Sequence, residues 1–98
     1  MKNTVKAITT KCEEVAAMFY QNKVAEGFEI LCMLIEDIQD LTKEISQQEE
    51  LLEKNADVLP GLNEALAEAL KAMEQMDTVL LADIMKYDVI ELLEQIEE

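Results

Sequence analysis

The sequence predicts an all-α domain, folded as two antiparallel helical hairpins that form an up-down four-helix bundle. Apolar residues recur at spacings of three and four along most of the chain, and no segment alternates between apolar and polar residues as a strand does. The only proline stands beside a glycine at Pro60-Gly61, between two stretches rich in helix formers. We expect a single domain with a first hairpin over 3–45, a connection over 46–58 and a second hairpin over 59–97.

The first hairpin is predicted by two apolar stripes on either side of a polar segment at 21–23. Asn22 tolerates a left-handed backbone conformation and can close a short turn between helices. The stripe before this turn consists of Val5, Ile8, Cys12, Val15, Ala16 and Phe19. The stripe after it has the four-three alternation of a bundle seam and consists of Val24, Phe28, Leu31, Ile35, Ile38, Thr42 and Ile45.

The second hairpin follows a polar connection in which 46–49 has the form of a capping box, so that the second helix either ends or kinks near Ser46. A third helix is expected to begin near Leu59 or Pro60, because proline is favoured in a first helical turn. Asp77 can cap a fourth helix with its carboxylate. The third helix has the stripe Leu62, Leu66, Ala69, Leu70, Met73 and Met76. The fourth has the arc Leu81, Ala82, Met85, Val89, Leu92, Leu93 and Ile96.

The two halves also resemble one another faintly. Aligning them places Asn22 on Asp77 and Val24 on Val79. Two amphipathic hairpins with the same period explain this likeness without a duplication.

Composition limits the classes of function. The chain of 98 residues has 22 acidic and 8 basic side chains, for a formal net charge of -14, and half of its residues are hydrophobic, too many for a disordered chain. Binding to nucleic acid or to an anionic membrane surface is disfavoured, because both need clustered cations. No apolar run reaches the roughly 18 residues that span a bilayer, and the N-terminal residues lack the apolar core of a signal peptide. We therefore expect a cytoplasmic protein, and the exclusive use of lysine as the basic residue suggests an AT-rich bacterial genome.

The sequence offers no constellation for catalysis, so we expect a non-enzymatic protein without a metal or cofactor. The absence of histidine excludes Ser-His, Cys-His and Glu-x-x-His sites. The two glycines, Gly27 and Gly61, are too far apart for a phosphate-binding loop. Carboxylates spaced three residues apart lie beside or opposite the apolar stripes and are interpreted as solvated faces. Cys12 and Cys32 fall at about the same level on facing helices, where we expect small buried hydrophobes rather than a redox pair.

One segment carries a family resemblance. Residues 76–93, MDTVLLADIMKYDVIELL, resemble the C-terminal segment of a group of small acidic helical proteins from low-GC Gram-positive bacteria with no assigned activity. That group has a proline near the end of the segment, where this chain has Glu91 or its neighbours. In size, charge and helix content the chain also looks like secretion and flagellar export chaperones, and this likeness is one of class only.

The function we expect is protein binding, as a small adaptor, chaperone or regulator. An acidic surface would speed the encounter with a basic or amphipathic helical partner, and apolar patches would supply the binding energy. The alternative is a self-assembling helical domain with a structural role.

Two surfaces are candidate contact sites, because two helices carry more apolar residues than one seam needs. The apolar arc of the second helix is about 200° wide, and its surplus flank is predicted to form a homodimer interface. This candidate dimer interface consists of Gly27, Ile30, Met33, Leu34 and Leu41. On the fourth helix, Leu80, Ile84 and Tyr87 lie at i, i+4 and i+7 outside the main arc, and form a candidate partner-binding patch with Tyr87 as its anchor. The alternative for both surfaces is burial by neighbouring helices.

Overall fold

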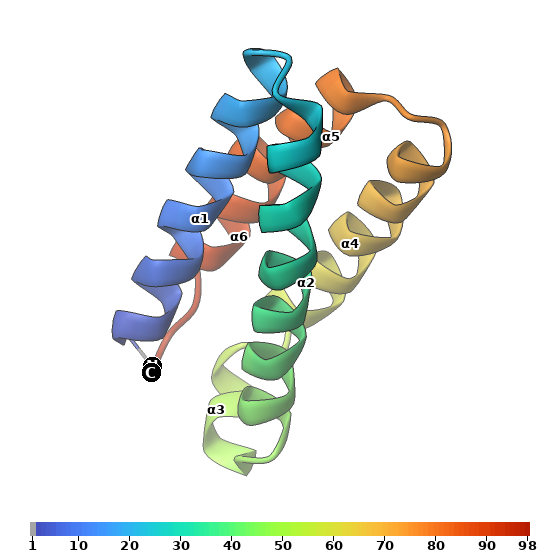
Figure 1. Cartoon of the computed structure of the whole chain (residues 1–98). Coiled ribbons are helices and arrows are strands. Elements are labelled where there is room, and N and C mark those ends of the chain that lie inside the picture. The colour runs from blue at the N-terminus through green and yellow to red at the C-terminus, as the bar shows by residue number, and fades with distance from the viewer. Residues whose placement is uncertain (1) are drawn as a thin grey trace.

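Helices make up all the regular secondary structure in the computed structural model, which describes residues 2–98 (Figure 1). The predicted all-α class is therefore confirmed. The elements are α1 Lys2–Tyr20, α2 Val24–Ser46, α3 Glu49–Lys54, α4 Val58–Glu74, α5 Thr78–Asp83, the π-helix η1 Ile84–Val89 and α6 Ile90–Glu94. Within residues 2–98, none of the helices combines the length and the apolar character needed to cross a bilayer.

The turn between α1 and α2 depends on Asn22, as predicted. Its φ of 62° lies in the left-handed region, which asparagine adopts more readily than most residues. The N–H of Lys23 donates to the carbonyl of Met18 at 2.8 Å, and the N–H of Asn22 donates to that of Phe19 at 3.0 Å. These bonds satisfy the last carbonyls of α1, and the two helices then lie antiparallel (Figure 1).

The seam of α2 is rotated from the predicted one. Its buried residues are Gly27, Leu31, Leu34, Ile38, Leu41 and Ile45. This series alternates four and three as well, so one wide apolar arc contains two overlapping seams that spacing alone does not distinguish. Gly27, Leu34 and Leu41, predicted at a dimer interface, lie instead in the core of a single chain.

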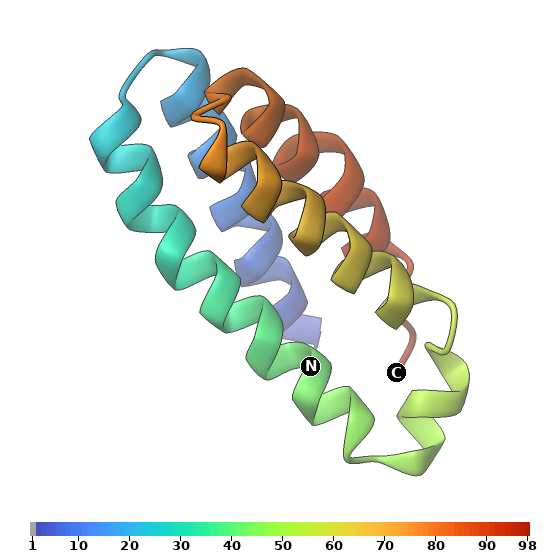
Figure 2. The same ribbon diagram turned by 90° about the vertical axis from the view of Figure 1, so that its right-hand side faces the viewer.

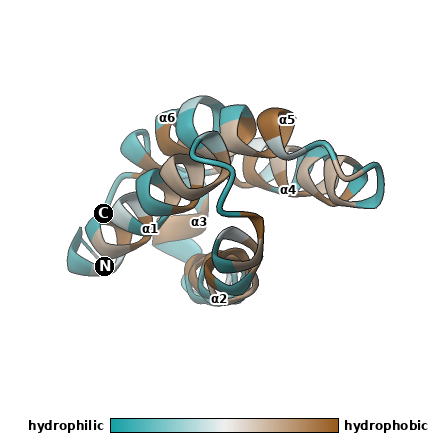
Figure 3. Ribbon diagram, turned by 45° about the horizontal axis from the view of Figure 1, so that its top comes forward, coloured by the Kyte–Doolittle hydropathy of each residue, from teal (hydrophilic) through white to brown (hydrophobic). Residues whose placement is uncertain are grey.

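The C-terminal helical segment, formed by α5, η1 and α6 in succession, occupies the middle of the molecule. It contacts α1 on one side and α4 on the other, whereas α2 makes its main backbone contacts with α1. Figure 3 shows α1, the C-terminal segment and α4 in a curved row, with α2 set to one side of it. Buried residues from all of these segments form one core.

The connection between the hairpins contains α3 and a buried polar clamp. The side-chain amide of Asn55, fully buried, donates to the carbonyls of Leu51 at 2.9 Å and Glu97 at 2.8 Å, and its side-chain oxygen accepts from the N–H of Glu97 at 2.7 Å. Nearby, Nζ of Lys54 donates to the main-chain oxygen of Glu98. The C-terminal tail is thereby held against the connection, at the end of the molecule where α1 begins (Figure 2).

Pro60 and Gly61 lie inside the first turns of α4, which begins at Val58, so the break between the hairpins falls before them. Proline is tolerated there because an N–H in the first turn has no partner within the helix. Gly61 allows α4 to approach α6 closely, since a Cβ at this position would lie 2.8 Å from Cδ2 of Leu92.

The buried face of α4 differs in part from the predicted stripe. It consists of Val58, Leu59, Leu62, Ala65, Leu66, Ala69 and Ala72. Leu70 is 53% exposed and Met76 is also exposed, so these two assignments were wrong. Alanines at three positions of the true stripe let α4 pack closely on the C-terminal segment, and Leu70 lies one residue past it.

The predicted fourth helix is interrupted by a π-helical stretch. It starts as predicted, because Oδ1 of Asp77 accepts from the N–H of Leu80 at 3.0 Å. Its largest fully buried side chains then follow at intervals of four: Leu81, Met85, Val89 and Leu93. In an α-helix each interval of four turns about 40° too far, so such a series would drift away from the core. The wider i to i+5 repeat of η1 offsets this drift and keeps the series buried.

Candidate functional site

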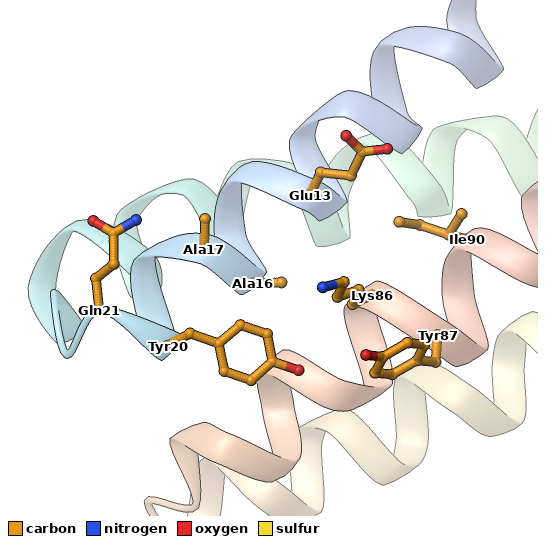
Figure 4. Close-up of a pocket in the computed structure, with 8 residues that line it drawn as sticks. All are labelled: Glu13, Ala16, Ala17, Tyr20, Gln21, Lys86, Tyr87 and Ile90. Atoms are coloured by element: carbon orange, nitrogen blue, oxygen red, sulfur yellow. The ribbon is translucent and has the colours of Figure 1, made fainter.

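A groove with a volume of about 560 Å³ lies between α1 and the C-terminal segment. It is lined by Glu13, Ala16, Ala17, Tyr20, Gln21, Lys86, Tyr87 and Ile90. Figure 4 shows Tyr20 and Tyr87 on facing helices, with the Lys86 amine turned toward α1 between them. The groove therefore joins residues from the two ends of the sequence.

Local sequence explains the shape of the groove. Ala16 and Ala17 present only methyl groups, which leaves room between α1 and η1. Tyr20 lies directly after the buried Phe19 and therefore off the apolar stripe of α1, where 44% of it is exposed. Tyr87 lies within the π-helical stretch and is 58% exposed. The groove thus has a small, apolar floor and two aromatic walls.

Lys86 places a positive charge over both aromatic rings. Its Nζ is 5.6 Å from the ring centroid of Tyr20 and 5.6 Å from that of Tyr87, within the range of a cation–π interaction. In the part of the chain that the structure describes, the side-chain ion pairs join Lys11 to Asp37 and Lys54 to Glu50. Lys86 is in neither of them, although the chain has 22 acidic residues.

The hydroxyl of Tyr20 donates a hydrogen bond to Oδ1 of Asp83, which ties the end of α1 to the end of α5. This hydrogen bond raises the pKa of Tyr20 to about 12, and desolvation and the negative charge of Asp83 act in the same direction. Tyr20 is neutral at physiological pH, and the raised pKa means that it keeps the donated proton to a higher pH than an ordinary tyrosine does. One wall of the groove is held in place by this bond.

The structure divides the predicted partner-binding patch. Tyr87 and Leu80 are exposed, and Tyr87 lines the groove, but Ile84 is only 3% exposed and belongs to the core. The assignment of Ile84 to a surface patch was wrong, because η1 packs against both α1 and α4 and neighbouring helices therefore cover more than one of its sides. Ile84 also lies three residues after the buried Leu81, on the same side of the helix.

The predicted dimer interface retains little free surface. A Cβ at Gly27 would lie 2.6 Å from Cε1 of Phe19, so this glycine accommodates a ring of its own chain, and that ring packs edge-on against Phe28. Ile30 is partly buried against the core. Of the five residues proposed, only Met33 is exposed, at 50%.

The two cysteines differ in environment, contrary to expectation. Cys12 is buried, and burial raises the pKa of its thiol to about 12, with the charge of Glu13 adding to the effect. Cys32 is exposed, because it follows Leu31 and the rotated seam turns it away from the core. Only Cys12 is the small buried hydrophobe that was predicted.

Sequence reasoning missed Tyr20, Lys86 and Glu13 as groove residues. A usable signal was present, because the chain has only two tyrosines and each lies beside an apolar stripe rather than in it. Their meeting across the groove depends on tertiary packing. Among residues 2–98, no three acidic or cysteine side chains gather into a group that could hold a metal ion.

The family model described as "Domain of unknown function (DUF8042)" matches residues 1–98 of the chain. No curated protein and no solved structure matches the chain.

Proposed function

The chain belongs to the DUF8042 family, and on that premise we propose that it is a non-enzymatic protein-binding module whose binding site is the groove between α1 and η1. It acts as a small acidic adaptor, chaperone or regulator. The observation that carries this proposal is the convergence of both tyrosines of the chain, each about half exposed, on one groove.

Aromatic side chains at a surface groove suit protein recognition. Tyrosine contributes a large apolar area with few rotatable bonds, and its hydroxyl can remain hydrated, so it is enriched among residues that dominate binding energy. The bond from Tyr20 to Asp83 restrains one ring in advance, which lowers the entropic cost of binding. A π-helical stretch at the groove agrees with this reading, since such stretches are frequent at functional sites.

The absence of histidine from the whole sequence supports a non-enzymatic role. The finer predictions belong to the same proposal: a bacterial protein of the cytoplasm, related to small acidic proteins of low-GC Gram-positive bacteria, with two hairpins in an up-down four-helix bundle. Contacts between α1 and α2, and of the C-terminal segment with α1 and α4, support that bundle.

The alternative function is self-assembly as a homodimer or larger structural array. It is favoured by exposed apolar side chains outside the groove, at Met33 on α2 and at Met76 and Val79 where α4 turns into α5.

Site-specific photo-crosslinking in the native host tests the proposal. A photoreactive phenylalanine analogue replaces Tyr87 in the groove or, as a matched control, the exposed Leu70 on α4. We expect a defined adduct with a different protein from position 87 but not from position 70, and less of it when Tyr20→Ala is added. Adducts with a second copy of the chain alone would establish the structural alternative, and no adduct at position 87 would remove the groove as a binding site.

A further inference from the structure

We infer that the groove between α1 and η1 receives the apolar face of a basic amphipathic helix from another protein, and that an arginine or lysine of that helix replaces the ammonium group of Lys86 over the rings of Tyr20 and Tyr87. This inference rests on the proposed protein-binding function and specifies the chemistry of the partner.

Charge selects a basic partner over a second copy. Each copy carries a net charge of -14, so two copies repel one another at low ionic strength, whereas a cationic segment is attracted. Carboxylates also lie at the groove itself, where Glu13 is part of the lining and Asp83 holds Tyr20. A cationic helix meets complementary charge there.

The position of Lys86 marks a cation site between two aromatic rings. Its Nζ is 5.6 Å from each ring centroid, and it has no ion pair with a carboxylate of residues 2–98 to hold it there. A lysine side chain is long and flexible, and Lys86 is exposed, so it can leave for solvent at small cost. A guanidinium group is planar and less strongly hydrated than an ammonium, and is therefore better suited to stack on the vacated rings.

The shape of the groove suits a helix. It runs between two helices, and the partly exposed Ala17 and Ile90 provide apolar surface beside the tyrosines (Figure 4). Its volume of about 560 Å³ accommodates a few anchoring side chains, which an amphipathic helix presents at i, i+3 or i+4, and i+7.

This inference predicts whether removal of the Lys86 charge strengthens or weakens binding. If the partner is basic, Lys86 competes with it for the rings and repels it, so removing the lysine strengthens binding. If the partner is acidic, Lys86 is the anchor, and removing it weakens binding.

The experiment measures the binding of three fluorescent peptides of about 18 residues, five helical turns, by anisotropy. The first has leucines and alanines on one helical face and arginines on the other, the second has the same composition in scrambled order, and the third has glutamate in place of arginine. Each is titrated with the wild-type chain, Lys86→Met, Tyr87→Leu and Lys71→Met. Lys71 lies on α4 and does not line this groove, so Lys71→Met makes the same change in net charge elsewhere.

We expect the basic amphipathic peptide to bind the wild-type chain at least about tenfold more tightly than the scrambled one. Lys86→Met should tighten its binding about three- to fivefold, Tyr87→Leu should weaken it about five- to tenfold, and Lys71→Met should change it less than about twofold. Circular dichroism on each variant confirms that the fold is retained.

Equal binding of the ordered and scrambled basic peptides would overturn the inference, because attraction would then be electrostatic only. Weaker binding by Lys86→Met, or preference for the glutamate peptide, would also overturn it. If no peptide binds while position 87 crosslinks a different protein in the host, the inference fails and the protein-binding function stands. If no peptide binds and position 87 also gives no crosslink to a different protein, the proposed protein-binding function fails as well.

Discussion

The two helical hairpins have the same backbone turn, but they differ in which position of the turn has the better-suited residue. Asn22 and Met76 both occupy the left-handed region, with φ of 62° and 55°. In each turn the N–H of the next residue donates to a carbonyl of the preceding helix, from Lys23 to Met18 at 2.8 Å and from Asp77 to Ala72 at 2.9 Å. The first hairpin has the better residue at the left-handed position, and the second has the better helix cap at Asp77. The structure therefore aligns Asn22 with Met76, one residue away from the alignment with Asp77 that the sequence suggested.

The second helices of the two hairpins, α2 and the C-terminal segment, differ more. α2 is a regular α-helix whose buried residues alternate four and three, whereas the C-terminal segment contains η1 and has its largest fully buried side chains at successive intervals of four. The C-terminal segment, which contains the irregularity, presents Lys86 and Tyr87 to the groove. In this molecule the candidate site lies where helical periodicity is interrupted, whereas the regular helix α2 contributes to the core.

The largest expected effect concerns the core residues of α2 and α4. Leu31→Ala should reduce the free energy of unfolding by about 3 to 5 kcal/mol, because Leu31 is fully buried, and Leu66→Ala on α4 by about 2 to 3 kcal/mol, because its burial is less complete. Urea unfolding measures both, with the exposed Leu70→Ala as a control that should cost less than about 0.5 kcal/mol. A loss at Leu31 no larger than at Leu70 would contradict the burial of Leu31 in the core.

The two glycines should respond differently to alanine. Gly27→Ala should cost about 1 to 3 kcal/mol, because the added methyl group meets the buried ring of Phe19. Gly61→Ala should cost less than about 1 kcal/mol, because it meets the flexible end of Leu92 and alanine improves helix propensity. Thermal unfolding of both variants makes the comparison, and equal losses would show that Leu92 is as restrained as Phe19.

Mutations can remove the helix cap of the second turn and introduce one in the first. Asp77→Ala should destabilise the protein by about 1 kcal/mol. Lys23 has nearly the same backbone geometry, φ -90° and ψ 69° against φ -88° and ψ 84° at Asp77, but makes no side-chain cap, so Lys23→Ser should add about 0.5 kcal/mol. Denaturant unfolding at moderate salt, which screens the change in charge, measures both. No gain from Lys23→Ser would mean that the first turn needs no cap.

The left-handed residues provide a smaller test. Met76→Gly should stabilise the protein by about 0.5 to 1 kcal/mol, because glycine adopts a positive φ without the Cβ clash. Asn22→Gly should change stability by only a few tenths of a kcal/mol, because asparagine already tolerates this conformation. Calorimetry on the two single variants compares the turns directly, and a loss of stability in Met76→Gly would show that its exposed side chain makes a contact worth more than the strain.

The smallest expected effect is the pH dependence of the link between the hairpins. The folded-state pKa of Tyr20, about 12, lies above its ordinary value of 10.0, so the folded protein holds this proton more tightly than the unfolded chain. The resulting stability is complete below pH 10 and is lost as the pH rises through about 12. Tyrosinate absorbance should show a step near pH 12 in the folded protein that is absent from Tyr20→Phe. A Tyr20 step near the ordinary value of 10.0 would contradict the hydrogen bond to Asp83.

Local chemistry determined a large part of the fold from the sequence alone. The helical class, the stripe of α1, the left-handed turn at Asn22 and the cap at Asp77 all depend on residues within a few positions of one another. Tyr87 could be singled out for the same reason, because it falls outside the arc of its own helix.

Tertiary structure decided how each helix is turned about its axis. The arc of α2 is wide enough for two seams, and only packing against the other segments selected the one that contains Leu34 and Leu41. Packing likewise buried Ile84, because η1 contacts both α1 and α4. The groove followed from the same packing, since Tyr20 and Lys86 are distant in sequence and only the contact between α1 and η1 brings them together. Periodicity specifies which side chains of a helix can be buried, but the free energy of burial depends on neighbouring segments that the local sequence does not specify.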